Sequence, residues 1–130
     1  MKEDASLRPF YRLLGLQVID GQPAGESRVE LAARPDLDNS RGDVHGGAIA
    51  GLIDAAVSVA VRSACTVGEG VATVSLTVNY AGPGRGTLVA RGRALRVGRS
   101  IATAEARVTD VNESLVAHAI ATLRIIAPRG

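Results

Sequence analysis

The residues best suited to chemistry lie between Asn39 and Asp54, where one carboxylate interrupts an apolar stretch. From Gly47 to Cys65 the chain consists almost entirely of Ala, Ile, Leu, Val and Gly, so we expect a buried helix there. A buried carboxylate without a partner is costly, so it needs a reason to be present. The burial cost and the low helix propensity of an aspartate at mid-helix therefore predict a functional carboxylate at Asp54.

This expected helix has one narrow polar seam. Asp54, Ser58 and Arg62 recur every four residues and share one face, which Gly47 and Gly51 continue toward the N-terminus. Asp54 and Arg62 lie roughly 12 Å apart along a helix, too far for a direct ion pair. The alternative to catalysis is a structural carboxylate that pairs with Ser58 or with a neighbour across an interface.

Composition limits the class of protein. The chain has 130 residues, of which 46% are hydrophobic, and this predicts one globular domain over residues 1–130. One phenylalanine, two tyrosines and no tryptophan offer no stacking platform for single-stranded nucleic acid, so no nucleic-acid partner is expected. Cys65 is the single cysteine and the two histidines lack metal-ligand spacing, so we expect neither a disulfide nor a metal site.

Charge and N-terminal sequence predict a cytoplasmic protein without membrane contact. The first ten residues contain no apolar signal core, and Asp54 and Arg62 divide the longest apolar stretch. The net charge of +2 arises from scattered arginines, but one region concentrates several that could serve a phosphorylated ligand. These are Arg85, Arg91, Arg93, Arg96 and Arg99.

Local patterns predict the elements that position these residues. A short helix is expected over 6–14, with Ser6 as its cap and Gly15 at its end, and a polar loop over 34–44 precedes the long helix. In the strand over 72–80, the even-numbered residues are apolar apart from the final tyrosine and should face the core together. The expected strands are 16–20, 26–33, 72–80, 87–97, 100–111 and 115–126. Strands that follow one another through short turns should pair antiparallel, and a sheet curled around the helix is the simplest way to cover it.

Several of these features together resemble one known family. They are Asn39, the His45-Gly46-Gly47 triplet, Asp54, the strand that ends in Asn79-Tyr80, the segment LRVGRSIATAEARV at 95–108 and the closing LVAHAIATLRI. The combination is similar to the hotdog-fold acyl-CoA thioesterases of the phenylacetate-degradation type, over nearly the whole chain. The resemblance implies an α+β hotdog fold, in which an antiparallel sheet wraps one central helix. It also implies a homodimer with a continuous sheet, usually a homotetramer, and acyl-CoA as substrate with no separate cofactor.

In the family's pattern, Asp54 is the nucleophile or general base, and the backbone N–H of Gly46 stabilises the oxyanion at the positive end of the helix. Gly46 and Asp54 would lie about 12 Å apart on one helix, so one carbonyl cannot touch both. Two antiparallel copies of the helix would bring Gly46 of one chain opposite Asp54 of the other. This geometry predicts an active site shared across a dimer interface.

Supporting roles near the acid follow from the resemblance, each with a plainer alternative. Asn39 would orient the thioester or the attacking water, or else only stabilise a turn. His45 would hold the glycine loop rather than transfer protons directly. Thr73 would orient the nucleophile or water, or else be an ordinary strand residue. Gly47 would let the substrate approach the backbone because it has no side chain.

Contacts to coenzyme A are expected from a second region. Gly98, Arg99 and Ser100 could form only a bulge between strands, or could offer backbone donors and a guanidinium to the pantetheine and phosphates, with Arg96 as a further candidate. His118 is expected at the surface or in an interface.

Two other functions compete with hydrolysis. A hotdog hydratase or dehydratase would need a histidine and an acid around a carbon–carbon bond, which the spacing of His45 and Asp54 fits poorly. A non-catalytic acyl-CoA sensor would usually carry a DNA-binding segment, which we do not find in these 130 residues. The acyl group stays open between aromatic, medium-chain and hydroxylated classes.

Overall fold

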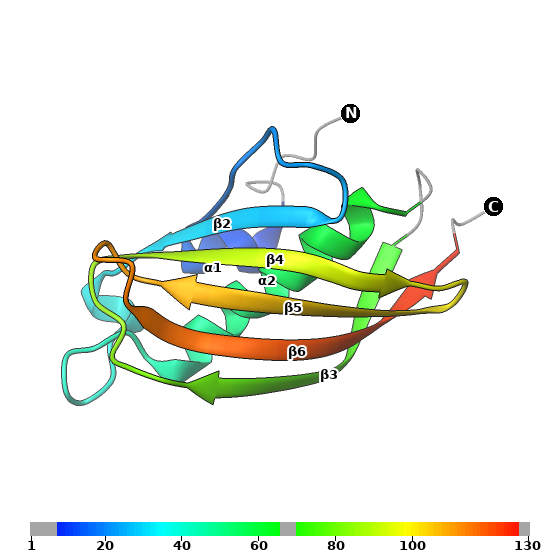
Figure 1. Ribbon diagram of the computed structural model, residues 1–130. Coiled ribbons are helices and arrows are strands. Elements are labelled where there is room, and N and C mark those ends of the chain that lie inside the picture. Colours follow the sequence, from blue (N-terminus) through cyan, green and yellow to red (C-terminus); the bar gives the residue numbers. More distant parts are fainter. Residues whose placement is uncertain (1–7, 66–69, 128–130) are drawn as a thin grey trace.

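The protein is an α+β hotdog fold, in which a six-stranded antiparallel sheet curls around one long helix (Figure 1). The computed structural model describes residues 8–65 and 70–127. In chain order the elements are α1 Pro9–Leu14, β1 Leu16–Val18, β2 Glu26–Ala32, the 3-10 turn η2 Pro35–Leu37, α2 Gly46–Ser63, β3 Gly70–Tyr80, β4 Thr87–Val97, β5 Ile101–Thr109 and β6 Leu115–Ile126.

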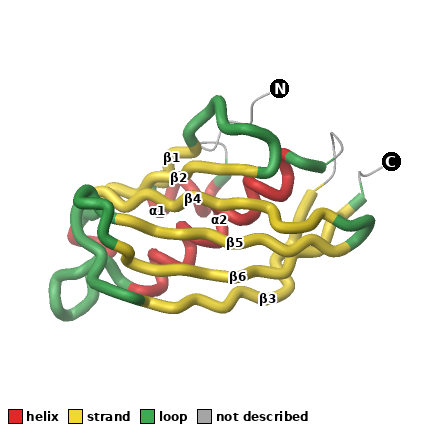
Figure 2. Tube along the Cα trace, viewed as in Figure 1, coloured by secondary structure: helices red, strands yellow, loops and turns green. Residues whose placement is uncertain are grey.

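The sheet order is β1-β2-β4-β5-β6-β3, and every neighbouring pair is antiparallel. Pairing of consecutive strands is thus confirmed for β1 with β2 and for β4 through β6. It is wrong for β3 and β4, because the 81–86 connection crosses the end of the sheet (Figure 2). β4, with Leu88 and Ala90 fully buried, takes a central place, whereas the more exposed β3 forms an edge.

Small side chains let the sheet approach α2 closely. The inner faces of β5 and β6 carry a run of buried alanines, and the helix fills the space with Leu52, Ile53 and Val57. At the closest point Ser27 donates a 2.6 Å hydrogen bond to the Ala56 carbonyl. By length and composition alone α2 could span a membrane, but half of it is buried inside the molecule, a pattern shared by core helices.

The helix is buried only on the side that the sheet covers. Asp54, Ser58 and Arg62 lie outside this buried side, with Asp54 next to the edge strand β3, and all three stay partly exposed, so the expected polar seam is real but not enclosed within one chain. Gly51 does not belong to the site side of this seam. A Cβ added there would lie 2.8 Å from Leu14 Cδ1, so Gly51 is where α1 packs on α2.

A β-bulge corrects the alternation expected in β3. Thr73 pairs with Leu123 and Ser75 with Thr122, which leaves Val74 as an extra residue. Val74 is 60% exposed instead of facing the core. The bulge reverses the side-chain parity, so that Thr73 before it and Tyr80 after it both reach α2.

The remaining boundaries differ from expectation by a few residues. α1 begins at Pro9 with Arg8 at the N-cap, and the predicted cap Ser6 lies outside the described residues. Gly15 ends α1 in a left-handed conformation, φ 75°, as its position predicted. β1 ends at Val18, two residues before the predicted boundary.

Candidate active site

The N-terminus of α2 leaves one backbone donor unused. His45 is the N-cap, and its Nδ1 accepts a 2.8 Å hydrogen bond from the N–H of Gly47. The His45 carbonyl accepts from the N–H groups of Ala48 at 2.9 Å and Ile49 at 3.1 Å. Of the first four N–H groups of the helix, only that of Gly46 has no acceptor among the described residues.

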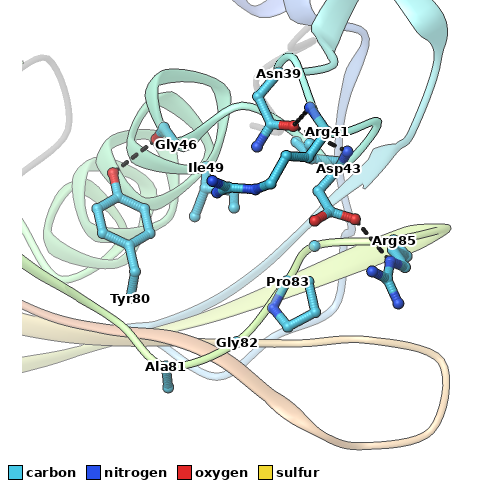
Figure 3. Close-up of a pocket in the computed structure, with 12 residues that line it drawn as sticks. Asn39, Arg41, Asp43, Gly46, Ile49, Tyr80, Ala81, Gly82, Pro83 and Arg85 are labelled. Atoms are coloured by element: carbon cyan, nitrogen blue, oxygen red, sulfur yellow. Dashed lines mark hydrogen bonds and ion pairs between the residues drawn. The ribbon is translucent and has the colours of Figure 1, made fainter.

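Two contacts fix the direction of this donor. The His45 carbonyl belongs to the same trans peptide as the Gly46 N–H, so binding two donors at the carbonyl aims the N–H the opposite way, out of the helix end. Tyr80 donates from its hydroxyl to the Gly46 carbonyl at 2.7 Å (Figure 3). The peptide between Gly46 and Gly47 is therefore held by Tyr80 at its carbonyl oxygen and by His45 Nδ1 at its N–H. A fixed donor at the positive end of a helix can stabilise a developing negative charge.

Asp54 has a partner that its helix alone does not predict. Thr73 Oγ1 donates to Asp54 Oδ1 at 2.5 Å, across from β3 to α2. The bulge after Thr73 makes this contact possible, because the side chain must point to the helix. With Oδ1 oriented in this way, Oδ2 remains able to act on a substrate or on water. The structure thus brings Thr73 and Asp54 together, and the predicted role of Thr73 in orienting the acid stays a prediction.

A pocket of about 560 Å³ opens beside the Gly46 end of the helix (Figure 3). The 39–46 segment forms one wall, and Tyr80 with the turn that follows it forms another. Asp54 and Thr73 do not line this pocket. Within one chain the Gly46 N–H and the Asp54 carboxylate are therefore separated, in keeping with the roughly 12 Å expected along the helix.

Asn39 shapes the loop that borders the pocket. Its Oδ1 accepts from the backbone N–H of Arg41 at 2.8 Å and of Asp43 at 3.1 Å, so the turn-stabilising role is present. Asp43 also forms a 2.7 Å ion pair with Arg85 Nε. Sequence reasoning did not single out Arg41 or Asp43, because a polar NSRGD loop reads as a turn and nothing in its pattern indicates a pocket.

The expected coenzyme A residues lie away from this pocket in the same chain. Gly98-Arg99-Ser100 forms the β4–β5 turn, at the far end of an 11-residue strand that spans roughly 35 Å. Gly98 donates its N–H to the Ile101 carbonyl at 2.9 Å, and a Cβ there would lie 2.8 Å from that oxygen. The tight turn therefore leaves no room for a side chain at Gly98. Arg96 follows a second bulge near the same end.

Two further arginines of β4, Arg91 and Arg93, do not line this pocket. Arg93 and His118 lie on the outer sheet face and both contact Glu105, at 2.7 and 3.5 Å. The hydrogen bond from Arg93, with a smaller contribution from His118, lowers the pKa of Glu105. Arg91 donates to Thr109 Oγ1 at 3.2 Å.

Among the described residues no three His, Cys, Asp or Glu side chains form a metal-binding group.

Comparison with known proteins shows the family to which the chain belongs. Residues 41–117 match the model of the thioesterase superfamily. A Halobacterium salinarum protein named as a candidate esterase is 43% identical over 100 residues, which cover 73% of this chain and 66%, just under two thirds, of that relative. The PaaI protein from the phenylacetic acid degradation operon of E. coli has a similar fold, with a TM-score of 0.86, 20% identity and coverage of 95% and 88% of the two chains. A conserved Pseudomonas aeruginosa protein has a TM-score of 0.87 at 26% identity, with coverage of 94% and 97%. The chain belongs to the thioesterase superfamily.

Proposed function

We propose that this protein hydrolyses acyl-CoA thioesters to a free acid and coenzyme A, in a site that two chains share. The observation that carries the proposal is the Gly46 N–H, which is oriented, unpartnered among the described residues and placed beside a pocket. Such a donor suits the oxygen of a thioester carbonyl as it gains negative charge.

The edge strand β3 supports a shared site. It is 11 residues long, has no lysine or proline, and exposes Val74, whereas edge strands usually carry features that prevent pairing. Antiparallel pairing of two β3 strands would extend the sheet and set the two α2 helices antiparallel. Gly46 of one chain would then approach Asp54 of the partner, and a homodimer, or a tetramer of two such dimers, would complete the site.

The chemistry divides between the two residues. With the carbonyl oxygen at Gly46, the carboxylate of Asp54 either attacks the carbonyl carbon itself or removes a proton from the water that attacks. In both routes the C–S bond breaks and coenzyme A leaves as a thiolate, which takes back the proton that Asp54 removed from water in the general-base route and takes a proton from solvent in the nucleophilic route. The first route passes through an anhydride that water then cleaves. Thr73 holds the carboxylate in position.

His45 does not favour the hydratase alternative. Its Nδ1 accepts from the N–H of Gly47, so the proton of the neutral ring sits on Nε2, and the residue caps the N-terminus of α2.

The test of the proposed function is steady-state hydrolysis of aromatic, medium-chain and hydroxylated acyl-CoAs, followed by thiol release. We expect turnover with at least one class and its loss in Asp54→Asn. Turnover that Asp54→Asn leaves intact would contradict the assignment.

A further inference from the structure

The pocket beside Gly46 has an apolar floor of limited size. Val44, Ile49 and Gly84 are buried beneath it, and Pro83 borders it. A sphere of the pocket's volume would be about 10 Å across, which suits a small acyl group rather than a long chain. With the thioester carbonyl at Gly46, the group that enters this space is the acyl arm.

The charges that line the pocket do not cancel. Asp43 is paired with Arg85, whose side chain is 72% exposed and points outward (Figure 3). Arg41 extends its side chain over the pocket between Asn39 and Ile49 (Figure 3), and its guanidinium has no partner among the described residues. The backbone N–H of Arg41 is held by Asn39 Oδ1 at 2.8 Å. One positive charge is therefore left without an ion-pair partner above the apolar floor of the pocket.

Building on the proposed thioesterase activity, we infer that Arg41 selects acyl groups that carry a carboxylate at the end remote from the thioester. A guanidinium binds a carboxylate through two parallel hydrogen bonds, and an apolar floor fits the methylene groups between the two ends. The phosphates of coenzyme A are the other anions of such a substrate. Two amide units separate these phosphates from the sulfur, so the pantetheine arm is longer than this pocket is wide. The phosphates would therefore lie beyond Arg41. A carbonyl at Gly46 therefore leaves Arg41 to the acyl arm.

The test compares thioesters of equal chain length with and without a terminal carboxylate. Glutaryl-CoA and adipyl-CoA are assayed against pentanoyl-CoA and hexanoyl-CoA, after subtraction of the uncatalysed rate, with wild-type protein and Arg41→Gln. Arg107→Gln is the matched control, because it removes the same charge from the exposed outer sheet face. The same acyl groups are also assayed as N-acetylcysteamine thioesters, which lack the phosphates.

We expect the wild-type protein to prefer the carboxylated substrates, and Arg41→Gln to lower kcat/KM for them roughly 10- to 100-fold, as for loss of a charged hydrogen-bond pair. The neutral substrates should change less than about threefold, and the preference should persist in the N-acetylcysteamine series. Equal losses on neutral and carboxylated CoA esters, with none on the truncated esters, would assign Arg41 to phosphate and overturn the inference. Hydrolysis of neutral esters without any carboxylate preference would also overturn it, while leaving the thioesterase activity standing. No hydrolysis of any ester would overturn both.

Discussion

At the scale of single residues, the proposed site depends on what holds Gly46 and Asp54. Gly46 contributes a backbone N–H whose direction is set by His45 and Tyr80. Asp54 contributes a carboxylate that Thr73 orients at 2.5 Å. The acid could be identified from sequence because it interrupts an apolar pattern, and Gly46 and Gly47 because their triplet with His45 resembles the family's motif. The contact of Tyr80 could not, because it joins residues 34 positions apart and depends on a strand bulge.

Removal of the acid should abolish turnover without unfolding the protein. We expect Asp54→Asn to lower kcat by at least about 100-fold, and Thr73→Val by about 10-fold, because the valine removes only the hydrogen bond that orients the carboxylate. Thr103→Val on the outer sheet face is the matched control and should keep full activity. Steady-state kinetics measures the loss of turnover, and far-UV circular dichroism shows whether each variant stays folded. More than about a tenth of wild-type turnover in Asp54→Asn would rule out its catalytic role.

Tyr80 is expected to act through Gly46. Tyr80→Phe keeps the ring but removes the 2.7 Å hydrogen bond to the Gly46 carbonyl. We expect kcat to fall about 3- to 10-fold with KM within about twofold, because the oxyanion donor is less firmly held while substrate contacts persist. Tyr11→Phe in α1 is the matched control, because it also removes one tyrosine hydroxyl. A rise in KM at constant kcat would show instead that Tyr80 binds substrate in the ground state.

At the scale of elements, the sequence predicts the long helix and most strand positions because their hydrophobic periods are long and clear. It does not predict the place of β3, since edge or centre depends on which partners cover each strand. Nor does it predict the bulge at Val74, because one extra residue leaves the local pattern looking like regular alternation. The hydrogen bond between Thr73 and Asp54 depends on that bulge, so the sequence could propose both residues but not their contact.

Two glycines of α2 should respond differently to an added methyl group. In Gly51→Ala the new Cβ would lie 2.8 Å from Leu14 Cδ1, so overpacking against α1 should outweigh the gain of about 1 kcal/mol from alanine in a helix and leave a net loss of stability of up to about 2 kcal/mol, with kcat/KM retained. In Gly46→Ala it would lie 3.3 Å from the Tyr80 ring, beside the donor, so kcat/KM should fall about 100-fold or more. Kinetics and thermal melts on both variants test this. Activity losses that simply follow stability losses would mean that both glycines serve packing.

The outer sheet face should contribute to stability in a pH-dependent way. Because Arg93 lowers the pKa of Glu105 in the folded protein, the carboxylate stabilises the fold at neutral pH, and this contribution disappears as pH falls through that lowered pKa. Glu105→Gln should therefore lower the free energy of unfolding at pH 7 by less than about 1 kcal/mol for so exposed a pair, seen as a slightly lower melting temperature. The difference from wild type should vanish in acid. A difference that stays constant from pH 7 into acid would contradict this role.

At the scale of the whole molecule, one chain holds the two halves of the proposed site at separate places. The pocket contains Gly46 but neither Asp54 nor Thr73. The exposed β3 edge offers the means to join two chains, and assembly as a dimer or tetramer follows as a prediction. Sedimentation at assay concentration should give at least a dimer. A fully active monomer would exclude the shared site.

Subunit complementation tests the central claim most directly. Asp54→Asn and Gly46→Ala chains, each inactive as a homodimer, are unfolded together, refolded at equal amounts and assayed. In a shared site the mixed dimer contains one intact site, formed by Gly46 of the first chain and Asp54 of the second. With random pairing, half of the dimers are mixed and one of their two sites works, so we expect about a quarter of wild-type activity. Activity no higher than that of the separate variants, in a preparation shown to contain mixed dimers, would contradict the account.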